Sequence, residues 1–257
     1  MQRFLAVLLL ASGLGCAHSS SPRDTISAPA PSSKTVLDLA DVTANPTHYE
    51  WFDFRPGVKK LILAGTPETE HVAILWYTVP DGHVGLHRHS KTESVYVIDG
   101  SQTDGKGAYP KGTAYFNPPG SGHEITNSSG FFLLAYAAPP DFAHTDAIGP
   151  YTPVRIDTAD PKLMSAPGTG SPETGTHTVD IPLDNAGGMS GRLIEISSPQ
   201  DPYEYLGNYL LVLGGSCEVS GMPLGKQALA VAKSVKPESF QVAAPASSTC
   251  LAMGVSF

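Results

Sequence analysis

The chain has 257 residues, of which 26 are glycine and 23 proline; only 16% are charged, and the formal net charge is −8. This length leaves room for two modest domains or one large all-β domain. The glycine and proline content favours short strands joined by turns over long helices. Because the chain is acidic and has no run of lysine and arginine that could follow a phosphate backbone, nucleic-acid binding is excluded as the expected function.

The first residues predict an export signal over residues 1–15. Arg3 precedes an apolar run from Phe4 to about Ala11, and small residues follow up to Cys16. The run is too short to span a membrane, which takes about 20 residues. Cys16 resembles the lipidated cysteine of bacterial lipoproteins. Gly13 stands where such proteins usually have leucine, so ordinary secretory cleavage nearby is the alternative.

Residues 16–35 are rich in serine, proline and alanine and predict a flexible tether. The expected location is the bacterial periplasm or the outer membrane, as a lipoprotein, with secretion as the alternative. Removal of residues 1–15 takes away Arg3 and no acidic residue, which changes the formal net charge from −8 to −9. Contact with a membrane is therefore expected only through the lipid on Cys16.

Apolar runs separated by turn residues fill residues 36–158 and predict an antiparallel barrel or sandwich. The runs are LILA, HVAILWYTVP, VGLHRH, ESVYVIDG, GTAYFNPPG and FFLLAYAAPP. Between them, DG at 81–82, DG at 99–100 and DGKG at 104–107 predict hairpin turns, because glycine adopts the positive φ that such turns require.

Residues 159–176 have the composition of a linker, and a second domain of strands is expected over 177–257. Its run NYLLVLGG can be laid over ESVYVIDG, which indicates a structural repeat. No histidine follows His177, so the second domain cannot repeat the imidazole chemistry of the first. Cys217 and Cys250 lie in this half. They either form a disulfide or are two inert core cysteines, and the sequence leaves both possibilities open.

Spacing selects four candidate metal ligands. His87 and His89 are two residues apart, so on a strand both imidazoles face the same side. Glu93 begins the next predicted strand after a tight turn, and its carboxylate can reach back toward the two rings. His123 lies on a later strand-like segment, so only the fold can bring it to the other three. Three imidazoles and one carboxylate suit divalent Fe, Mn, Zn, Ni or Cu.

Two motifs around these residues resemble the signatures of the cupin superfamily. HRHSKTESVYVIDG (87–100) fits H-x-H-x3-E-x6-G, and GTAYFNPPGSGHEITN (112–127) fits G-x5-P-x-G-x2-H-x3-N. One departure is Gly82, which stands five residues before the first histidine, where the family often has glycine six before it. The resemblance implies a jelly-roll barrel in which His87, His89, Glu93 and His123 hold one divalent metal ion.

The whole chain resembles a bicupin related to ChrR-like and uncharacterised bicupins. This implies an all-β fold of two tandem jelly-roll barrels, with a metal-binding N-terminal barrel and a degenerate C-terminal one. In the overlay of the two halves, the first two ligand positions fall on Pro202 and Glu204, and Glu93 falls on Asn208. The last ligand has no counterpart, so the second barrel is expected to bind no metal.

The residues around the four candidate ligands are expected to have structural roles. His83 would face the same side of a strand as His87 and His89, so it could donate a hydrogen bond to one of these ligands. We expect it to be exposed to solvent instead. The remaining histidines are expected at the surface: His48, His71, His144 and His177. The aromatic residues of the predicted strands are expected mostly in the barrel core, with some lining a pocket: Trp76, Tyr77, Tyr96, Phe116 and Tyr136. Asn127 is predicted as a turn or strand-end residue.

Two classes of function remain open. The first is a metal-dependent oxygenase, lyase or isomerase acting on a small organic molecule, because four protein ligands leave open positions at the ion. The second is a non-catalytic periplasmic protein that binds a metal or small ligand for sensing, and the fold alone cannot choose between them. The expected partners are a small molecule and, from the duplicated architecture, a second copy of the chain in a homodimer.

Overall fold

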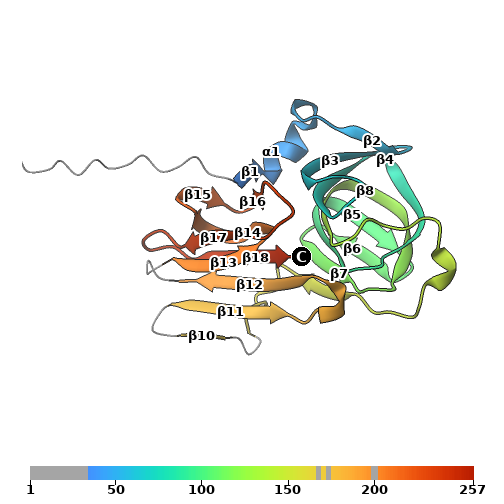
Figure 1. Ribbon diagram of the computed structural model, residues 1–257. Coiled ribbons are helices and arrows are strands. Elements are labelled where there is room, and N and C mark those ends of the chain that lie inside the picture. Colours follow the sequence, from blue (N-terminus) through green and yellow to red (C-terminus); the bar gives the residue numbers. More distant parts are fainter. Residues whose placement is uncertain (1–33, 166–168, 172–174, 198–201) are drawn as a thin grey trace, which may run out of the picture. The chain divides into compact units, whose positions relative to one another are not determined.

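The computed structural model describes residues 34–165, 169–171, 175–197 and 202–257. The predicted signal peptide, nearly all of the tether and the predicted lipidation site Cys16 lie outside these residues. Among the described residues, no helix is long and apolar enough to cross a membrane. The all-β prediction is confirmed, because the described chain folds into two antiparallel sheets (Figure 1).

The sheet of the N-terminal half has eight strands among the described residues, in the order β2-β3-β4-β8-β5-β7-β9, with β6 on β5. Their bounds are β2 (Phe52–Arg55), β3 (Val58–Gly65), β4 (His71–Arg88), β5 (Glu93–Asp104), β6 (Gly107–Pro110), β7 (Thr113–Asn117), β8 (Gly122–Tyr136) and β9 (Val154–Asp157). The long strands β4, β5 and β8 lie side by side and carry the two sequence motifs.

The second sheet has ten strands among the described residues, with the order β1-β16-β14-β18-β12-β11-β10; β15 pairs with β14, and β17 with β13 and β14. Their bounds are β1 (Lys34–Asp38), β10 (Thr169–Ser171), β11 (Thr176–Ile181), β12 (Ser190–Ile196), β13 (Tyr203–Gly207), β14 (Tyr209–Val219), β15 (Met222–Gly225), β16 (Ala228–Ala232), β17 (Glu238–Ala243) and β18 (Cys250–Ser256). Short helices complete the described chain: α1 (Leu39–Ala44), η1 (Pro46–His48), η2 (Thr145–Ala147) and η4 (Asn185–Gly187).

Strand β1 belongs to the second sheet although it lies at the start of the chain. It pairs antiparallel with β16 along its whole length, from Lys34 opposite Ala232 to Asp38 opposite Ala228. The sequence boundary at residue 36 assigns most of this strand to the first barrel. Helix α1 follows it, with the carboxylate of Asp38 capping the N-terminus by accepting from the backbone N–H of Ala40.

The continuous apolar runs of the sequence are strands whose two faces are both buried. In β5, Val95 and Val97 face the interior of the first barrel, whereas Tyr96 and Ile98 join a core cluster shared by both halves. Strand β14 alternates in the same way between that shared cluster and the interior of the second barrel. Burial of the shared cluster removes apolar side chains of both halves from water, which stabilises the two sheets as one unit.

Two of the three predicted hairpins are wrong. Strand β4 runs through DG at 81–82 with a shift in its pairing to β8, and Asp81 rather than the glycine has positive φ, at 60°. Strand β5 runs through DG at 99–100 with a similar shift, and Gly100 has φ 78°. Both pairs lie at irregularities of the pairing, which accommodate the backbone conformations of a tight turn without reversing the chain. DGKG at 104–107 does form the predicted hairpin, between β5 and β6.

A disulfide joins Cys217 and Cys250, which the sequence left open. The cysteines stand 33 residues apart in the chain, and their Cα atoms are 4.7 Å apart. Both side chains are fully buried in the interior cluster of the second barrel. The bond therefore crosslinks β14 to the last strand, β18.

Candidate metal centre

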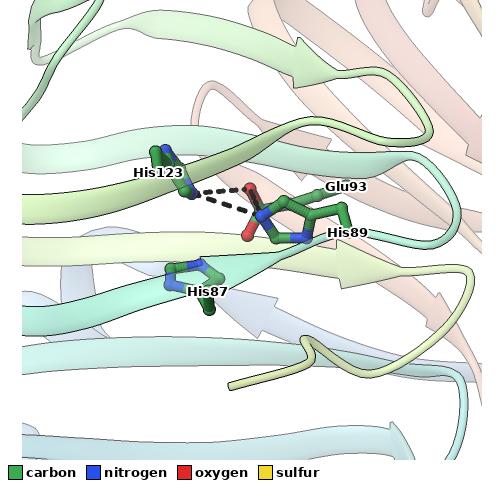
Figure 2. Close-up of side chains that lie close together, drawn as sticks. All are labelled: His87, His89, Glu93 and His123. Atoms are coloured by element: carbon green, nitrogen blue, oxygen red, sulfur yellow. Dashed lines mark hydrogen bonds and ion pairs between the residues drawn. The ribbon is translucent and has the colours of Figure 1, made fainter. Parts of the chain in front are cut away.

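Four side chains converge inside the first barrel, as the motifs predict (Figure 2). His87 lies near the end of β4, His89 follows that strand, Glu93 begins β5, and His123 is the second residue of β8. Each is at most 5% exposed. One potential ligand atom from each residue lies within 4.8 Å of the other three. Across residues 34–165, 169–171, 175–197 and 202–257, this is the single group of its kind.

Backbone hydrogen bonds tie the two motifs together. The N–H of His89 donates to the carbonyl of Ser121 at 2.9 Å, and the N–H of Gly120 donates back to the carbonyl of His89 at 2.8 Å. Gly120 has φ 79°, a conformation that a residue with Cβ rarely adopts. In the resulting register between β4 and β8, His87 lies opposite His123. The loop of the second motif thus brings a ligand that is distant in sequence to the histidine pair.

The histidines are oriented with their Nε2 atoms toward one another. A carbonyl oxygen can only accept, so the 2.9 Å contact to Gly85 places the proton of His87 on Nδ1 and leaves a lone pair on Nε2. His123 donates from Nδ1 to Oδ2 of Asp104 at 2.8 Å, which leaves Nε2 as the nitrogen directed at the group. Nε2 of His89 and Nε2 of His123 are 3.3 Å apart.

The carboxylate of Glu93 is held at the centre of the group. Its Oε2 lies 3.3 Å from Nε2 of His89 and 3.5 Å from Nε2 of His123. The side-chain amide of Asn117, on β7, donates to the same oxygen at 2.8 Å. This hydrogen bond fixes the carboxylate in the direction of the imidazoles.

Charges in the group follow from burial and from the close carboxylates. Burial lowers the pKa of His87 to about 3 and that of His89 to about 4, so both imidazoles stay neutral. Burial alone would raise the pKa of Glu93, but the three imidazoles lower it below its ordinary range, so the group remains a carboxylate. Burial would also lower the pKa of His123, but its hydrogen bonds to Asp104 and Glu93 raise it to about 9.

This donor set fits a divalent metal ion. Two of the three imidazoles have their Nδ1 proton engaged elsewhere, which is how proteins orient ligating histidines. The converging atoms are nitrogen and carboxylate oxygen, the ligand types of Fe, Mn, Zn, Ni and Cu sites. A cation at this point would also compensate the buried carboxylate.

The sequence did not single out Asp104 and Asn117. DGKG predicts a turn, and Asp104 does accept from the N–H of Lys106 at 2.7 Å, but its second oxygen binds His123. Asn117 stands directly before the prolines of the second motif and pairs with Glu93 across β5 and β7. Both contacts depend on the pairing of strands that are distant in sequence, so no local sequence pattern predicts them.

A small cavity adjoins the four residues. Its lining includes three of the ligands, His87, Glu93 and His123, and two aromatic residues expected from the sequence, Tyr77 and Tyr136. Other lining residues are mostly apolar: Phe54, Leu75, Val84, Gln102, Ile125, Leu134, Pro140 and Phe142. It offers about 10 Å³ of room for the centre of a water molecule, which is space for a ligand of about that size beside the site.

A loop of the second half supports the ligand-bearing turn between His89 and Glu93. The N–H of Thr92 donates to the carbonyl of Gly187 at 3.0 Å, and Lys91 Nζ donates to the carbonyl of Ala186 at 3.3 Å. A Cβ on Gly187 would lie 1.8 Å from Oγ1 of Thr92, so only glycine permits this approach. The degenerate half therefore contributes to the site by packing.

The sequence overlay of the two halves is wrong in register around the ligands. Strand pairing places Tyr205 opposite Phe240 in the second barrel, as His87 is opposite His123 in the first. Both aromatic side chains are buried in the interior of that barrel, whereas Glu204 is exposed. The connection between β13 and β14 is shorter than the turn between β4 and β5, which shifts the correspondence.

Other sequence expectations have mixed outcomes. His83 is about half exposed and pairs with Glu124 at 2.7 Å, away from the four ligands, as expected. The surface prediction is wrong for His71, which is fully buried. Its imidazole contacts Lys60 of β3 and the ring of Tyr136 of β8, so burial arises from pairing between strands. Among the other aromatic residues, Tyr96 and Phe116 are in the shared core, and Trp76 packs at its edge.

Comparisons with known proteins agree with this architecture. Residues 39–139 match the family model of the ChrR cupin-like domain. None of the curated proteins compared matches the chain. Three similar solved structures show the fold.

A candidate dioxygenase from Nostoc punctiforme is 13% identical, with a TM-score of 0.58, covering 86% of this chain and 82% of that one. Salicylate 1,2-dioxygenase from Pseudoaminobacter salicylatoxidans, bound to gentisate, is 12% identical, with a TM-score of 0.53, covering 86% and 80%. A cupin 2 conserved barrel domain protein from Leptotrichia buccalis is 10% identical, with a TM-score of 0.53, covering 86% and 96%. Together with the two motifs and the buried cluster, these findings identify residues 39–139 as a ChrR cupin-like domain of the cupin superfamily.

Proposed function

We propose that this protein is a metal-dependent enzyme that acts on a small organic molecule, with one divalent ion held by His87, His89, Glu93 and His123. The observation that carries the proposal is the cavity beside the buried cluster. A structural metal site is closed on all sides by protein, whereas a catalytic one keeps space for a further ligand. When bound, the ion supplies Lewis-acid chemistry and a template for the substrate or, if it is iron, oxygen chemistry.

The protein's own residues have defined parts in this proposal. Gly85 and Asp104 hold the protons of His87 and His123 on Nδ1, which leaves the Nε2 atoms free to ligate. Asn117 holds the carboxylate of Glu93 in place. The apolar wall of the cavity limits access of water and would strengthen electrostatic interactions inside it.

Oxygenation is the first reaction to test, because two structures with the same fold are described as dioxygenases. Their substrates do not transfer at this level of identity. The size of the cavity favours a substrate, or a reacting part of one, that is much smaller than an aromatic ring.

The experiment is metal analysis of the purified full-length chain, followed by oxygen uptake with a panel of small organic acids. We expect one metal ion per chain and oxygen uptake that depends on it. Glu93→Ala should lose both. His144→Ala is the matched control, since His144 is 76% exposed and pairs only with Asp141 among the described residues. Equal metal content in the wild type and Glu93→Ala would contradict the proposal.

A non-catalytic role in metal or ligand sensing is the second candidate, because the four buried side chains could hold an ion without any turnover. In that case the chain would hold its metal tightly and show no turnover. Metal analysis combined with the activity panel separates the two outcomes.

We further propose that the protein is exported and anchored through Cys16. The N-terminal sequence supports this, and so does the disulfide between Cys217 and Cys250, because such bonds persist mainly in oxidising compartments. Incorporation of labelled palmitate into the wild type, and its loss in Cys16→Ser, would support the anchor. Equal labelling of the two proteins would refute it.

A further inference from the structure

Lys60 is a buried cation directed into the first barrel. It stands on β3 two residues after Val58, which belongs to the interior core, and its Cα partner on β4 is Leu75, which lines the cavity. Only 1% of Lys60 is exposed. The neighbouring Lys59 has the opposite parity and makes a surface ion pair with Asp53.

The surroundings of Lys60 contain a hydrogen-bond acceptor but no close anion. His71 donates from Nδ1 to the carbonyl of Thr69 at 2.7 Å, so its Nε2 accepts from Nζ of Lys60 at 3.2 Å. Nζ also lies 4.1 Å from the ring centre of Phe54 and 5.3 Å from that of Tyr136. In the part of the chain that the structure describes, no carboxylate lies within 4.0 Å of Nζ.

A buried ammonium without an ionic partner is costly, and an apolar side chain would usually serve folding better. Burial lowers the pKa of Lys60 to about 8, and the charge of Glu93 limits this shift. Glu93 and Asp104 together carry the charge that balances a divalent ion. Lys60 has no such carboxylate beside it among the described residues, and a monoanion in the cavity would supply the missing counter-charge.

Both rings beside Lys60 form walls of the cavity. A second cation stands on the same wall, since the guanidinium of Arg55 lies 4.7 Å from the ring centre of Phe54 and 4.2 Å from that of Phe142. No ion pair to Arg55 occurs among the described residues. In a chain with a net charge of −8, two such cations make this wall locally positive.

The cavity also has an unused hydrogen-bond donor. The hydroxyl of Tyr77 is buried and has no hydrogen-bond partner among the described residues. Burial raises the pKa of Tyr77 above its ordinary value; the charge of Glu93 adds to the rise and the nearby side chain of Gln102 opposes it, so the phenol keeps its proton. A buried polar group without a partner is destabilising and calls for an explanation, such as a missing ligand.

We infer that the cavity binds a small monoanion with oxygen acceptors, of the size of formate, which Tyr77 hydrogen-bonds and Lys60 holds by charge. The inference rests on the proposed metal site and names the class of molecule that enters it. Lys60 attracts the anion electrostatically without touching it, because the rings of Phe54 and Tyr136 lie between Nζ and the cavity. Tyr77 contacts the ligand directly.

The test is calorimetric titration of the full-length chain loaded with a divalent ion, using formate and its neutral isostere formamide. We expect formate to bind the wild type at least about tenfold more tightly, since one partly screened charge interaction is worth roughly that factor. Lys60→Met should reduce this preference by about that factor, whereas the matched control Lys59→Met should keep it. Tyr77→Phe should weaken formate binding several-fold while metal content stays unchanged.

Metal content is measured before each titration, so loss of the metal site is distinguished from loss of the anion site. Equal affinity of the loaded wild type for formate and formamide would overturn the inference, and so would an unchanged preference in a folded, loaded Lys60→Met. If Lys60→Met does not fold, Tyr77→Phe decides, because unchanged formate binding in that loaded variant would also overturn the inference.

Discussion

Replacing Asp104 with asparagine should weaken metal binding although Asp104 itself is not a ligand. Its carboxylate accepts from Nδ1 of His123 at 2.8 Å and from the N–H of Lys106 at 2.7 Å. Asparagine has one acceptor and one donor group in place of two acceptors. One of these two N–H groups would then face an NH₂, and the negative charge behind His123 would be lost.

The size of the effect follows from burial. The side chain of Asp104 has no exposed surface, so its charge is not screened by solvent. Removing such a partner of a ligating histidine typically weakens metal affinity about 10–100-fold. This corresponds to about 1.4–2.7 kcal/mol of binding free energy.

The assay is competition for the metal between the protein and a chromophoric chelator, with unfolding of the metal-free proteins measured in parallel. Asp99→Asn is the matched control, because Asp99 lies on the same strand and makes an exposed ion pair with Lys111. Its metal affinity should equal that of the wild type. A folded Asp104→Asn with wild-type metal affinity would refute the role assigned to this carboxylate.

Three further changes test other parts of the structure. Glu93→Ala should lose most of the bound metal in elemental analysis, because no carboxylate would remain among the ligands; full occupancy would count against the site. Cys217→Ser opens a crosslink spanning 33 residues and should lower the free energy of unfolding by roughly 3–4 kcal/mol in denaturant titrations; an unchanged midpoint would contradict this. Gly187→Ala forces a Cβ against Thr92 and should lower the free energy of unfolding by roughly 1–3 kcal/mol. Gly149→Ala, where a Cβ meets nothing within 4 Å, should be nearly neutral in the same assay.

The four proposed ligands could be predicted because their chemistry lies in two contiguous motifs. Strand parity puts His87 and His89 on one face, and the spacing to Glu93 permits one tight turn. The position of His123 followed from the family resemblance, and the pairing of β4 with β8 confirms that it lies beside the others.

What the sequence missed depends on contacts between distant strands. His71 resembles a surface residue beside an acidic segment, and only Lys60 and Tyr136 from neighbouring strands bury it. Asp104 has the local role of a turn residue, which hides its second contact to His123.

The DG pairs at 81–82 and 99–100 show a different limit. Positive φ is needed in a hairpin turn and in a bulge alike, so the residue types do not tell whether the chain reverses. The pairing of β4 and β5 with β8 decides it, and both strands continue through these positions.

The most direct test of the account is X-ray absorption fine structure of the metal-loaded full-length chain, read at the edge of the bound metal. We predict a first shell of nitrogen and oxygen atoms at about 2.0–2.2 Å, with the outer-shell scattering of three imidazoles. Glu93→Ala should lose one light atom from that shell or lose the metal. A shell that contains sulfur, or one without imidazole scattering, would contradict the assignment of His87, His89, Glu93 and His123.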